Sequence, residues 1–161
     1  MIVRVAVEAE AARLGEIGFE AWRTSAFGAN DAGRTDADAL RGEFTQFCIE
    51  KPESIILAAD GDRFLGWGAR EFSDQVITDL WVAPEAQGKG VGAALLAALE
   101  EAIAIAGFSH AELETYAGNA GAVRFYSRQG YEPVWRGMKF TASLNYDLEK
   151  IRFRKMLPAA E

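Results

Sequence analysis

Cysteine and histidine are almost absent from this chain of 161 residues, which has one of each. Because Cys48 is the single cysteine, an internal disulfide is excluded, and a reducing compartment is the simplest assumption. We expect Cys48 to be a small buried hydrophobe on a helix rather than a nucleophile. His110 cannot build a histidine-rich metal site alone, and no cysteine or carboxylate cluster has ligand spacing, so the sequence predicts no metal.

Long apolar runs and an excess of positive charge are also missing. The first residues lack the apolar core of a secretory leader, and no stretch approaches the ~20 residues that a membrane span needs. We therefore expect a cytoplasmic protein with no membrane partner. A net charge of -7 and a pI of 4.9 argue against nucleic acid as a partner. An acidic field would instead favour cationic acceptors such as amines, although most soluble domains carry such a charge without using it.

Glycine, in contrast, is concentrated in one stretch. An apolar, strand-like run over 76–82 is followed by Gly88, Gly90 and Gly92, and then by apolar residues at helical spacing. Glycine adopts positive φ readily and has no Cβ to keep a ligand away from the main chain. Because a helix N-terminus offers unpaired N–H groups and the positive end of the helix dipole, this stretch predicts a phosphate site built from the backbone.

Two familiar phosphate loops compete for this stretch. The P-loop is excluded because Gly90, not serine or threonine, follows Lys89. Gly88-x-Gly90-x-x-Ala93 does satisfy the loose dinucleotide fingerprint, and Glu114 lies in a later strand about where a ribose-binding acid is expected. However, a connector that includes a proline separates the strand from the first glycine, whereas that fingerprint starts where its strand ends. A nicotinamide-dependent enzyme stays open as an alternative.

A third interpretation covers the whole stretch. Val82-x-Pro84-x-x-Gln87-Gly88-x-Gly90-x-Gly92 followed by an apolar helix resembles the acyl-CoA-binding segment of the GCN5-related N-acetyltransferase (GNAT) family. Further along, Asn119-x-x-Ala122-x-x-Phe125-Tyr126-x-x-x-Gly130-Tyr131 resembles the second signature of that family. Two signatures in the right order and spacing are far more specific than one glycine pattern.

The resemblance implies one α/β (α+β) acetyltransferase domain over 1–161. Its GNAT-like central sheet would be mixed and mostly antiparallel, with six to seven strands, one splayed parallel pair and about four flanking helices. The residue patterns predict strands over 2–7, 54–59, 63–72, 76–82, 111–116, 131–135 and 150–157. They predict helices that begin at Glu8, at a Thr35-x-x-Asp38 capping box, at Lys89 and at Asn119. Residues 24–34 read as a loop and 136–149 as an uncertain connector.

The order of strand 76–82, helix and strand 111–116 makes these two strands parallel, because such crossovers are right-handed. By the resemblance, the two strands splay apart, and the pantetheine arm of acetyl-CoA lies between them, hydrogen-bonded to the main chain of Leu80 and Val82. The pyrophosphate would lie on the main-chain N–H groups of Gln87, Gly88, Lys89, Gly90, Val91, Gly92 and Ala93. A merely solvated Lys89 is an equally good interpretation of that side chain.

The helix after Asn119 would supply the other wall of the site. Asn119 and Tyr126 are two helical turns apart, so they project from one face. By the resemblance, Asn119 contacts the cofactor and the Tyr126 hydroxyl protonates the departing thiolate. The structural alternatives are a plain N-cap for Asn119 and a core aromatic residue for Tyr126.

A carboxylate near the bend of the fourth strand often helps to deprotonate the amine in this family. Alternation would place Ile77, Asp79 and Trp81 on one sheet face, which gives Asp79 apolar neighbours that raise its pKa. Asp79 is therefore the candidate base, with Glu71 and Glu20 as rivals and a solvated strand aspartate as the alternative. We expect an acceptor pocket near Trp22, Phe27, Asn30, Asp31, Phe72 and Trp135.

The sequence thus predicts an acyl-CoA-dependent N-acetyltransferase that moves acetyl from acetyl-CoA to a primary amine of a small molecule or peptide. A non-catalytic acyl-CoA-binding or regulatory module on the same fold is the alternative. Members of the family often form homodimers through their last strands, which this sequence neither supports nor excludes.

Overall fold

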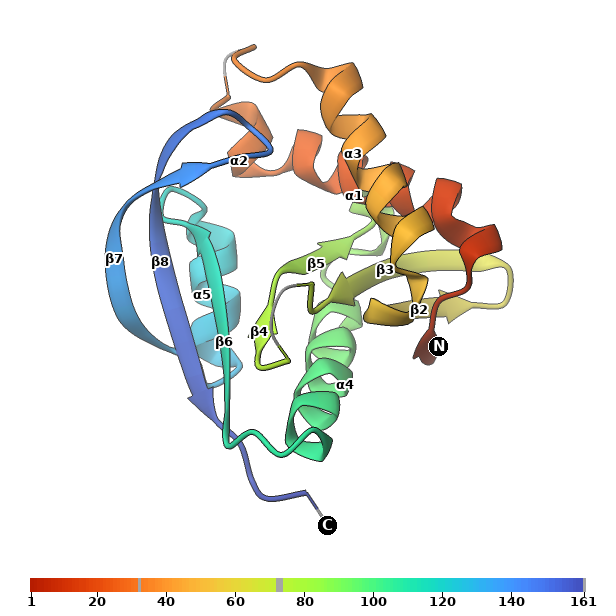
Figure 1. Cartoon of the computed structure of the whole chain (residues 1–161), viewed down its shortest axis with the longest axis vertical. Coiled ribbons are helices and arrows are strands. Elements are labelled where there is room, and N and C mark those ends of the chain that lie inside the picture. The colour runs from red at the N-terminus through yellow and green to blue at the C-terminus, as the bar shows by residue number, and fades with distance from the viewer. Residues whose placement is uncertain (32, 72–73, 161) are drawn as a thin grey trace.

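The computed structural model in Figure 1 describes residues 1–31, 33–71 and 74–160. Within these ranges the strands form two four-stranded sheets. In the first sheet all neighbours are antiparallel, and the order is β1 (Ile2–Val5), β2 (Ile55–Asp60), β3 (Arg63–Ala69), β5 (Asp79–Val82). The order in the second sheet is β4 (Val76–Ile77), β6 (His110–Tyr116), β8 (Tyr146–Met156), β7 (Glu132–Thr141). Only β4 and β6 are parallel, so the expected mixed fold with one parallel pair is confirmed.

The strand predicted over 76–82 divides between the two sheets at Thr78. The main-chain N–H of Thr78 donates to the Ala69 carbonyl at 2.9 Å, and the N–H of Glu71 donates to the Thr78 hydroxyl at 3.1 Å. Residues before Thr78 pair with β6 and residues after it pair with β3, which is the splay that the family resemblance implied.

Because of this break, the prediction that Ile77, Asp79 and Trp81 share one sheet face is wrong. Ile77 packs in the core cluster that contains Leu99 of the helix after the glycine turn, whereas Trp81 packs against the cluster around Trp67 on the other side of the first sheet. Asp79 lies opposite Ala69 of that second cluster, so it shares the face of Trp81 and not that of Ile77.

Helices cover the sheets in two layers. As Figure 1 shows, α1 (Ala11–Thr24) and α3 (Ala37–Glu50) pack on one face of the first sheet. Leu14 and Cys48 belong there to the same buried cluster as Trp67. Cys48 is buried on a helix, as predicted. α4 (Val91–Ile105) lies against both sheets, and α5 (Ala120–Arg128) packs on the second. The short helices are α2 (Ala26–Ala29), η1 (Glu8–Glu10), η2 (Pro52–Ser54) and η3 (Pro84–Ala86).

Two local predictions in the N-terminal half are wrong. The expected loop over 24–34 contains α2, which Ser25 caps by accepting from the Gly28 N–H. α3 is capped by Asp36, whose carboxylate accepts from the Ala39 N–H at 3.1 Å. Thr35, the predicted cap, instead donates its N–H and its hydroxyl to Asp31 at 2.8 and 2.6 Å.

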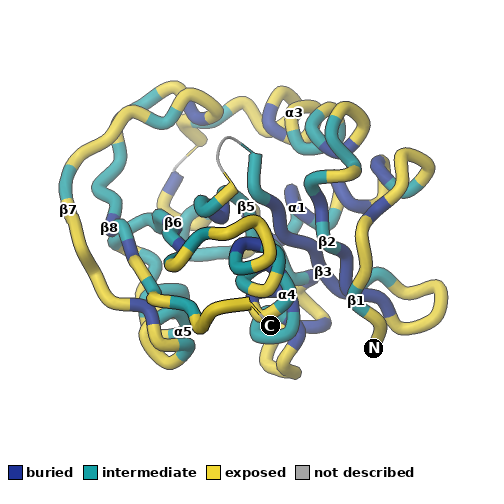
Figure 2. The backbone as a smooth tube through the Cα atoms, turned by 60° about the horizontal axis from the view of Figure 1, so that its bottom comes forward, coloured by how far each residue is buried: buried dark blue, intermediate teal, exposed yellow. Residues whose placement is uncertain are grey.

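The uncertain connector over 136–149 is a long β-hairpin. β7 pairs with β8 from Glu132 opposite Arg154 to Thr141 opposite Tyr146, around a turn in which Asn145 has φ 61°. Almost every residue of β7 is exposed, as the yellow tube in Figure 2 shows, so hydrophobic alternation gave no signal there. At its tip, Leu144 is buried against Phe19, Trp22 and Leu40, which joins the second sheet to α1 and α3.

Candidate active site

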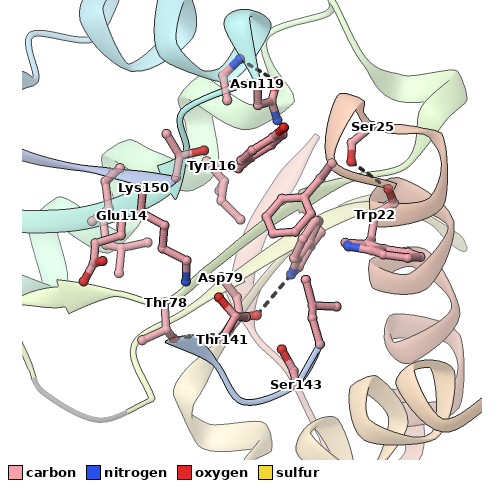
Figure 3. Close-up of a pocket in the computed structure, with 18 of the residues that line it drawn as sticks. Trp22, Ser25, Thr78, Asp79, Glu114, Tyr116, Asn119, Thr141, Ser143 and Lys150 are labelled. Carbon is pink, nitrogen blue, oxygen red and sulfur yellow. Dashed lines mark hydrogen bonds between the residues drawn. The ribbon is translucent and has the colours of Figure 1, made fainter. Parts of the chain in front are cut away.

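The two sheets separate around a pocket of about 800 Å³. Its walls come from β5, the ends of β4 and β6, the start of α5, the α1–α3 layer and the tip of the β7–β8 hairpin. Figure 3 shows side chains from these elements directed toward a common space. Leu80, Asp79, Asn119 and Tyr126, which the sequence singled out separately, all line it. A crevice where strands of an α/β fold diverge is a common ligand site.

Asp79 lies at the start of β5, where the strand leaves Thr78. Its carboxylate accepts from the Trp81 indole N–H at 3.1 Å and lies 3.0 Å from the Thr78 hydroxyl. Burial raises the pKa of Asp79 above its usual range, and these two hydrogen bonds only partly oppose that effect. A carboxylate with a raised pKa in a pocket has the property that a general base requires.

The two rival carboxylates differ in position. Glu71 lines the pocket, and burial together with the charge of Asp79 raises its pKa. Glu20 instead pairs with Arg23 at 2.7 Å on the outer face of α1, away from the pocket-lining residues. Of these three carboxylates, Asp79 and Glu71 therefore face the pocket and Glu20 does not.

Asn119 and Tyr126 lie on the pocket-facing side of α5, as their spacing predicted. The side-chain oxygen Oδ1 of Asn119 accepts from the Ala122 N–H at 3.1 Å, so this residue is the N-cap and its side-chain amide nitrogen is left for another partner. Burial, and the nearby charge of Asp79, raise the pKa of Tyr126. Its hydroxyl, which makes no hydrogen bond within the described chain, therefore stays protonated and can donate one.

The glycine turn lies outside this pocket but beside its α5 wall. Gly88 and Gly90 have φ of 74° and 83°, with open space where a Cβ would be. Gly92 has a different role, because a Cβ there would lie 3.3 Å from the ring of Phe125 on α5. Gly90 is the N-cap of α4, so the helix begins at Val91 rather than at Lys89.

The first turn of α4 has unused donors. Ala94 is the first helical residue with a bonded main-chain N–H, which donates to Gly90 at 3.1 Å. The N–H groups of Val91, Gly92 and Ala93 before it have no partner within the residues described. Lys89 extends back to the Glu85 carbonyl at 3.0 Å, on the exposed side of the turn. These donors and the helix dipole make the turn suited to an anion.

The edge of β5 that faces away from β3 also carries main-chain groups. Ala83 donates its N–H to Leu65 on the β3 side, and antiparallel ladders alternate, so Val82 and Leu80 direct their main-chain groups to the other side. No strand described here pairs with that edge. The side chain of Gln87 reaches across it and donates to the Val82 carbonyl at 3.1 Å.

The predicted acceptor residues fall into two groups. Trp22 and Phe27 line the pocket, and the ring of Phe27 lies 5.2 Å from that of Tyr116 between centroids. Asn30, Asp31 and Trp135 do not line it. Asp31 instead holds the loop before α3, accepting from Thr35 and from the Tyr146 hydroxyl. Phe72 lies outside the described residues.

The sequence did not predict several residues of this pocket, among them Glu114, which it offered only as a ribose ligand in the dinucleotide alternative. Glu114 and Tyr116 on β6, Thr141 at the end of β7 and Lys150 on β8 all line the pocket. Alternation along β8 places Lys150, Arg152 and Arg154 on one face, but only the position of the hairpin shows that this face meets the pocket at Lys150.

The dinucleotide alternative fails on the fold. β5, the strand before the glycine turn, has an antiparallel partner, and η3 intervenes before Gly88. Glu114, its proposed ribose ligand, pairs with Lys139 at 2.6 Å. Across the residues described, no three His, Cys, Asp or Glu side chains are arranged to hold a metal ion. None of the helices described combines the length and apolar character of a membrane span.

Known proteins share this architecture. The family model of the acetyltransferase (GNAT) family matches residues 18–131. A GCN5-related N-acetyltransferase from Rhodopseudomonas palustris superposes with a TM-score of 0.79 at 19% identity, covering 97% of this chain and 95% of that one. The PaiA N-acetyltransferase from Thermoplasma acidophilum, solved with coenzyme A, gives 0.73 at 15% identity over 97% and 98%.

A third solved structure is yncA from Salmonella typhimurium, a putative acetyltransferase with its cofactor acetyl-CoA. It gives a TM-score of 0.68 at 19% identity and covers 100% of this chain and 96% of that one. At such identities these structures establish the fold. No curated protein sequence matches the chain significantly.

Proposed function

Because the chain belongs to the acetyltransferase (GNAT) family, we propose that it transfers the acetyl group of acetyl-CoA to a primary amine of a small molecule or peptide by direct attack. The observation that carries this proposal is the pocket itself. It brings Asp79, Tyr126 and Asn119 together at the point where the two sheets diverge, next to the unused donors of α4.

The residues present fit a coenzyme A ligand. The free edge of β5 offers the main-chain groups of Leu80 and Val82 to the amides of a pantetheine arm. The N–H groups from Gln87 to Ala93 would hold the pyrophosphate at the positive end of α4. In the free protein the Gln87 side chain donates to the Val82 carbonyl and so occupies part of this edge. It would have to share or release that carbonyl when the pantetheine arm binds.

The pocket side chains supply proton transfer. An amine attacks only when neutral, so Asp79 would accept its proton, directly or through a water molecule. The nitrogen bonds to the thioester carbonyl carbon while the carbon–sulfur bond breaks, and the second proton that the nitrogen loses goes to solvent. Tyr126 would donate a proton to the leaving sulfur, or a hydrogen bond to it, since its raised pKa keeps the hydroxyl protonated.

Thermal unfolding with acetyl-CoA, CoA and NAD tests the ligand class first. A ligand at 100 times its Kd adds about 2.7 kcal/mol, which raises Tm by roughly 5 to 10 °C for a chain of this size. We expect this shift with acetyl-CoA and CoA and none with NAD. An amine screen that follows release of free thiol then separates the enzyme from a non-catalytic acyl-CoA-binding module. No shift with either CoA compound would end the proposal.

A further inference from the structure

Lys150 is a pocket residue that the chemistry described so far does not use. It lies on β8, opposite Tyr116 of β6 and Gly137 of β7. Its side chain lines the pocket, and Figure 3 shows the ammonium end directed into the pocket interior rather than out along the sheet. The partly buried side chain thus places a positive charge inside a cavity of an acidic protein.

The other cations of the same hairpin are all paired with carboxylates. Lys139 contacts Glu114 at 2.6 Å, and Arg152 lies 3.5 Å from the same carboxylate. The remaining partnered cations are Arg136, Arg154 and Lys155. Within the described chain the side-chain ammonium of Lys150 makes no ion pair or hydrogen bond. Its three N–H donors therefore face the pocket without an acceptor.

The surroundings of Lys150 disfavour an isolated ammonium. Burial lowers its pKa, and Lys139 lowers it further, although the charge of Glu114 opposes both effects. Lys139 and Arg152 both contact Oε1 of Glu114, whereas its Oε2 is buried without a hydrogen-bond partner, and among the described residues Glu114 makes no ion pair with Lys150. An anionic group in the pocket would supply the missing counter-charge and accept the free donors.

The charges that line the pocket complement a molecule that carries both a cationic and an anionic group. Asp79 and Glu71 provide negative charge where an amine would react, whereas Lys150 provides positive charge on the wall formed by the second sheet. Aromatic side chains that include Phe27 and Tyr116 also line the pocket. The indole N–H of Trp22 is buried and also lacks a partner among the described residues, which adds a second donor for an acceptor oxygen.

We propose that the amine acceptor carries a carboxylate that pairs with Lys150, so that the substrate class is an amino-carboxylate such as an amino acid. This inference rests on the proposed acetyl transfer and specifies its second substrate. Lys150 is then a specificity-determining residue: it binds the carboxylate while Asp79 faces the amine.

Matched pairs of acceptors test this directly. Each pair is an amino acid and the amine left when its carboxylate is removed, such as tyrosine and tyramine, phenylalanine and phenethylamine, or lysine and cadaverine. The kcat/KM of each is measured by thiol release. We expect the wild-type protein to prefer the amino acid. Lys150→Gln should lower kcat/KM for the amino acid about 10- to 100-fold, as expected for a lost charge-assisted hydrogen bond, and change that for the amine less than threefold.

Two further variants control this measurement. Arg154→Gln removes one positive charge from the same face of β8 outside the pocket, and it should leave the acceptor preference unchanged. Lys150→Arg should restore part of the preference. The Kd for CoA should be equal in all of these proteins, since Lys150 is assigned to the acceptor and not to the cofactor.

The outcomes separate this inference from the proposed function. Turnover of amines with no preference for the carboxylated member, or an equal loss of both activities in Lys150→Gln, would overturn the amino-carboxylate assignment and leave acetyl transfer standing. Absence of CoA binding and of turnover with every amine would instead overturn the proposed function.

Discussion

Replacing Asp79 by asparagine should lower activity and raise stability at the same time. Asparagine keeps the size of the side chain and an oxygen for the Trp81 indole N–H, but it cannot accept a proton from an amine. We expect kcat/KM to fall about 100- to 10,000-fold, the range that general acid–base catalysis contributes. The Kd for CoA should not change, because Asp79 lies in the pocket and not at the glycine turn.

The stability effect follows from the raised pKa of Asp79. A carboxyl group whose pKa is higher in the folded state binds its proton more tightly there than in the unfolded chain. Between the unfolded value of 3.8 and the raised folded value, the free energy of unfolding falls as pH rises, and it stays lower above that window. Asparagine does not ionise, so the variant does not lose this part of the free energy of unfolding as pH rises. Each pKa unit corresponds to about 1.36 kcal/mol, or roughly 3 to 5 °C in Tm at this size.

Thermal unfolding of both proteins at pH 4.5 and pH 8, with thiol-release kinetics at pH 8, gives the two readouts. The gain in Tm should be larger at pH 8. Glu71→Gln is the matched control, since its carboxyl also has a raised pKa and also lines the pocket. Full activity in Asp79→Asn would refute the assignment of the base, and loss of activity in Glu71→Gln alone would transfer that role to Glu71. An unchanged Tm would refute the electrostatic reasoning.

Three more substitutions test the other parts of the site. Tyr126→Phe should reduce kcat about 100-fold or more without weakening CoA binding, and full activity with the best acceptor would make Tyr126 structural. Gly90→Ala forces a side chain into φ 83° at a cost of about 1 to 2 kcal/mol and should weaken acetyl-CoA binding roughly 5- to 30-fold by calorimetry. Gly61→Ala, at φ 59° in a turn away from the site, should lose similar stability but bind normally; equal binding losses would contradict the phosphate role. Leu144→Ala should cost about 2 to 5 kcal/mol, and an unchanged Tm would show that the hairpin tip does not hold the two halves together.

The local structural features of the candidate site were predictable from the sequence. Gly88 and Gly90 need positive φ, Asn119 caps its helix, and a spacing of two helical turns aligns Asn119 with Tyr126. These features are set by neighbours along the chain, so a sequence pattern can carry them. The prediction of the cap of α3 was wrong by one residue, because Thr35 donates to Asp31 four residues earlier and the adjacent Asp36 caps the helix instead.

The sequence by itself determined the glycine turn on a helix N-terminus, the parallel pair beside it and the candidate acid and base. The tertiary structure alone decided what completes the pocket. β7 has no hydrophobic alternation because most of it faces solvent, and the position of the β7–β8 hairpin is fixed only when Leu144 reaches α1 and α3. Lys150 therefore became a pocket residue through contacts between segments more than a hundred residues apart in the chain, which no local pattern records.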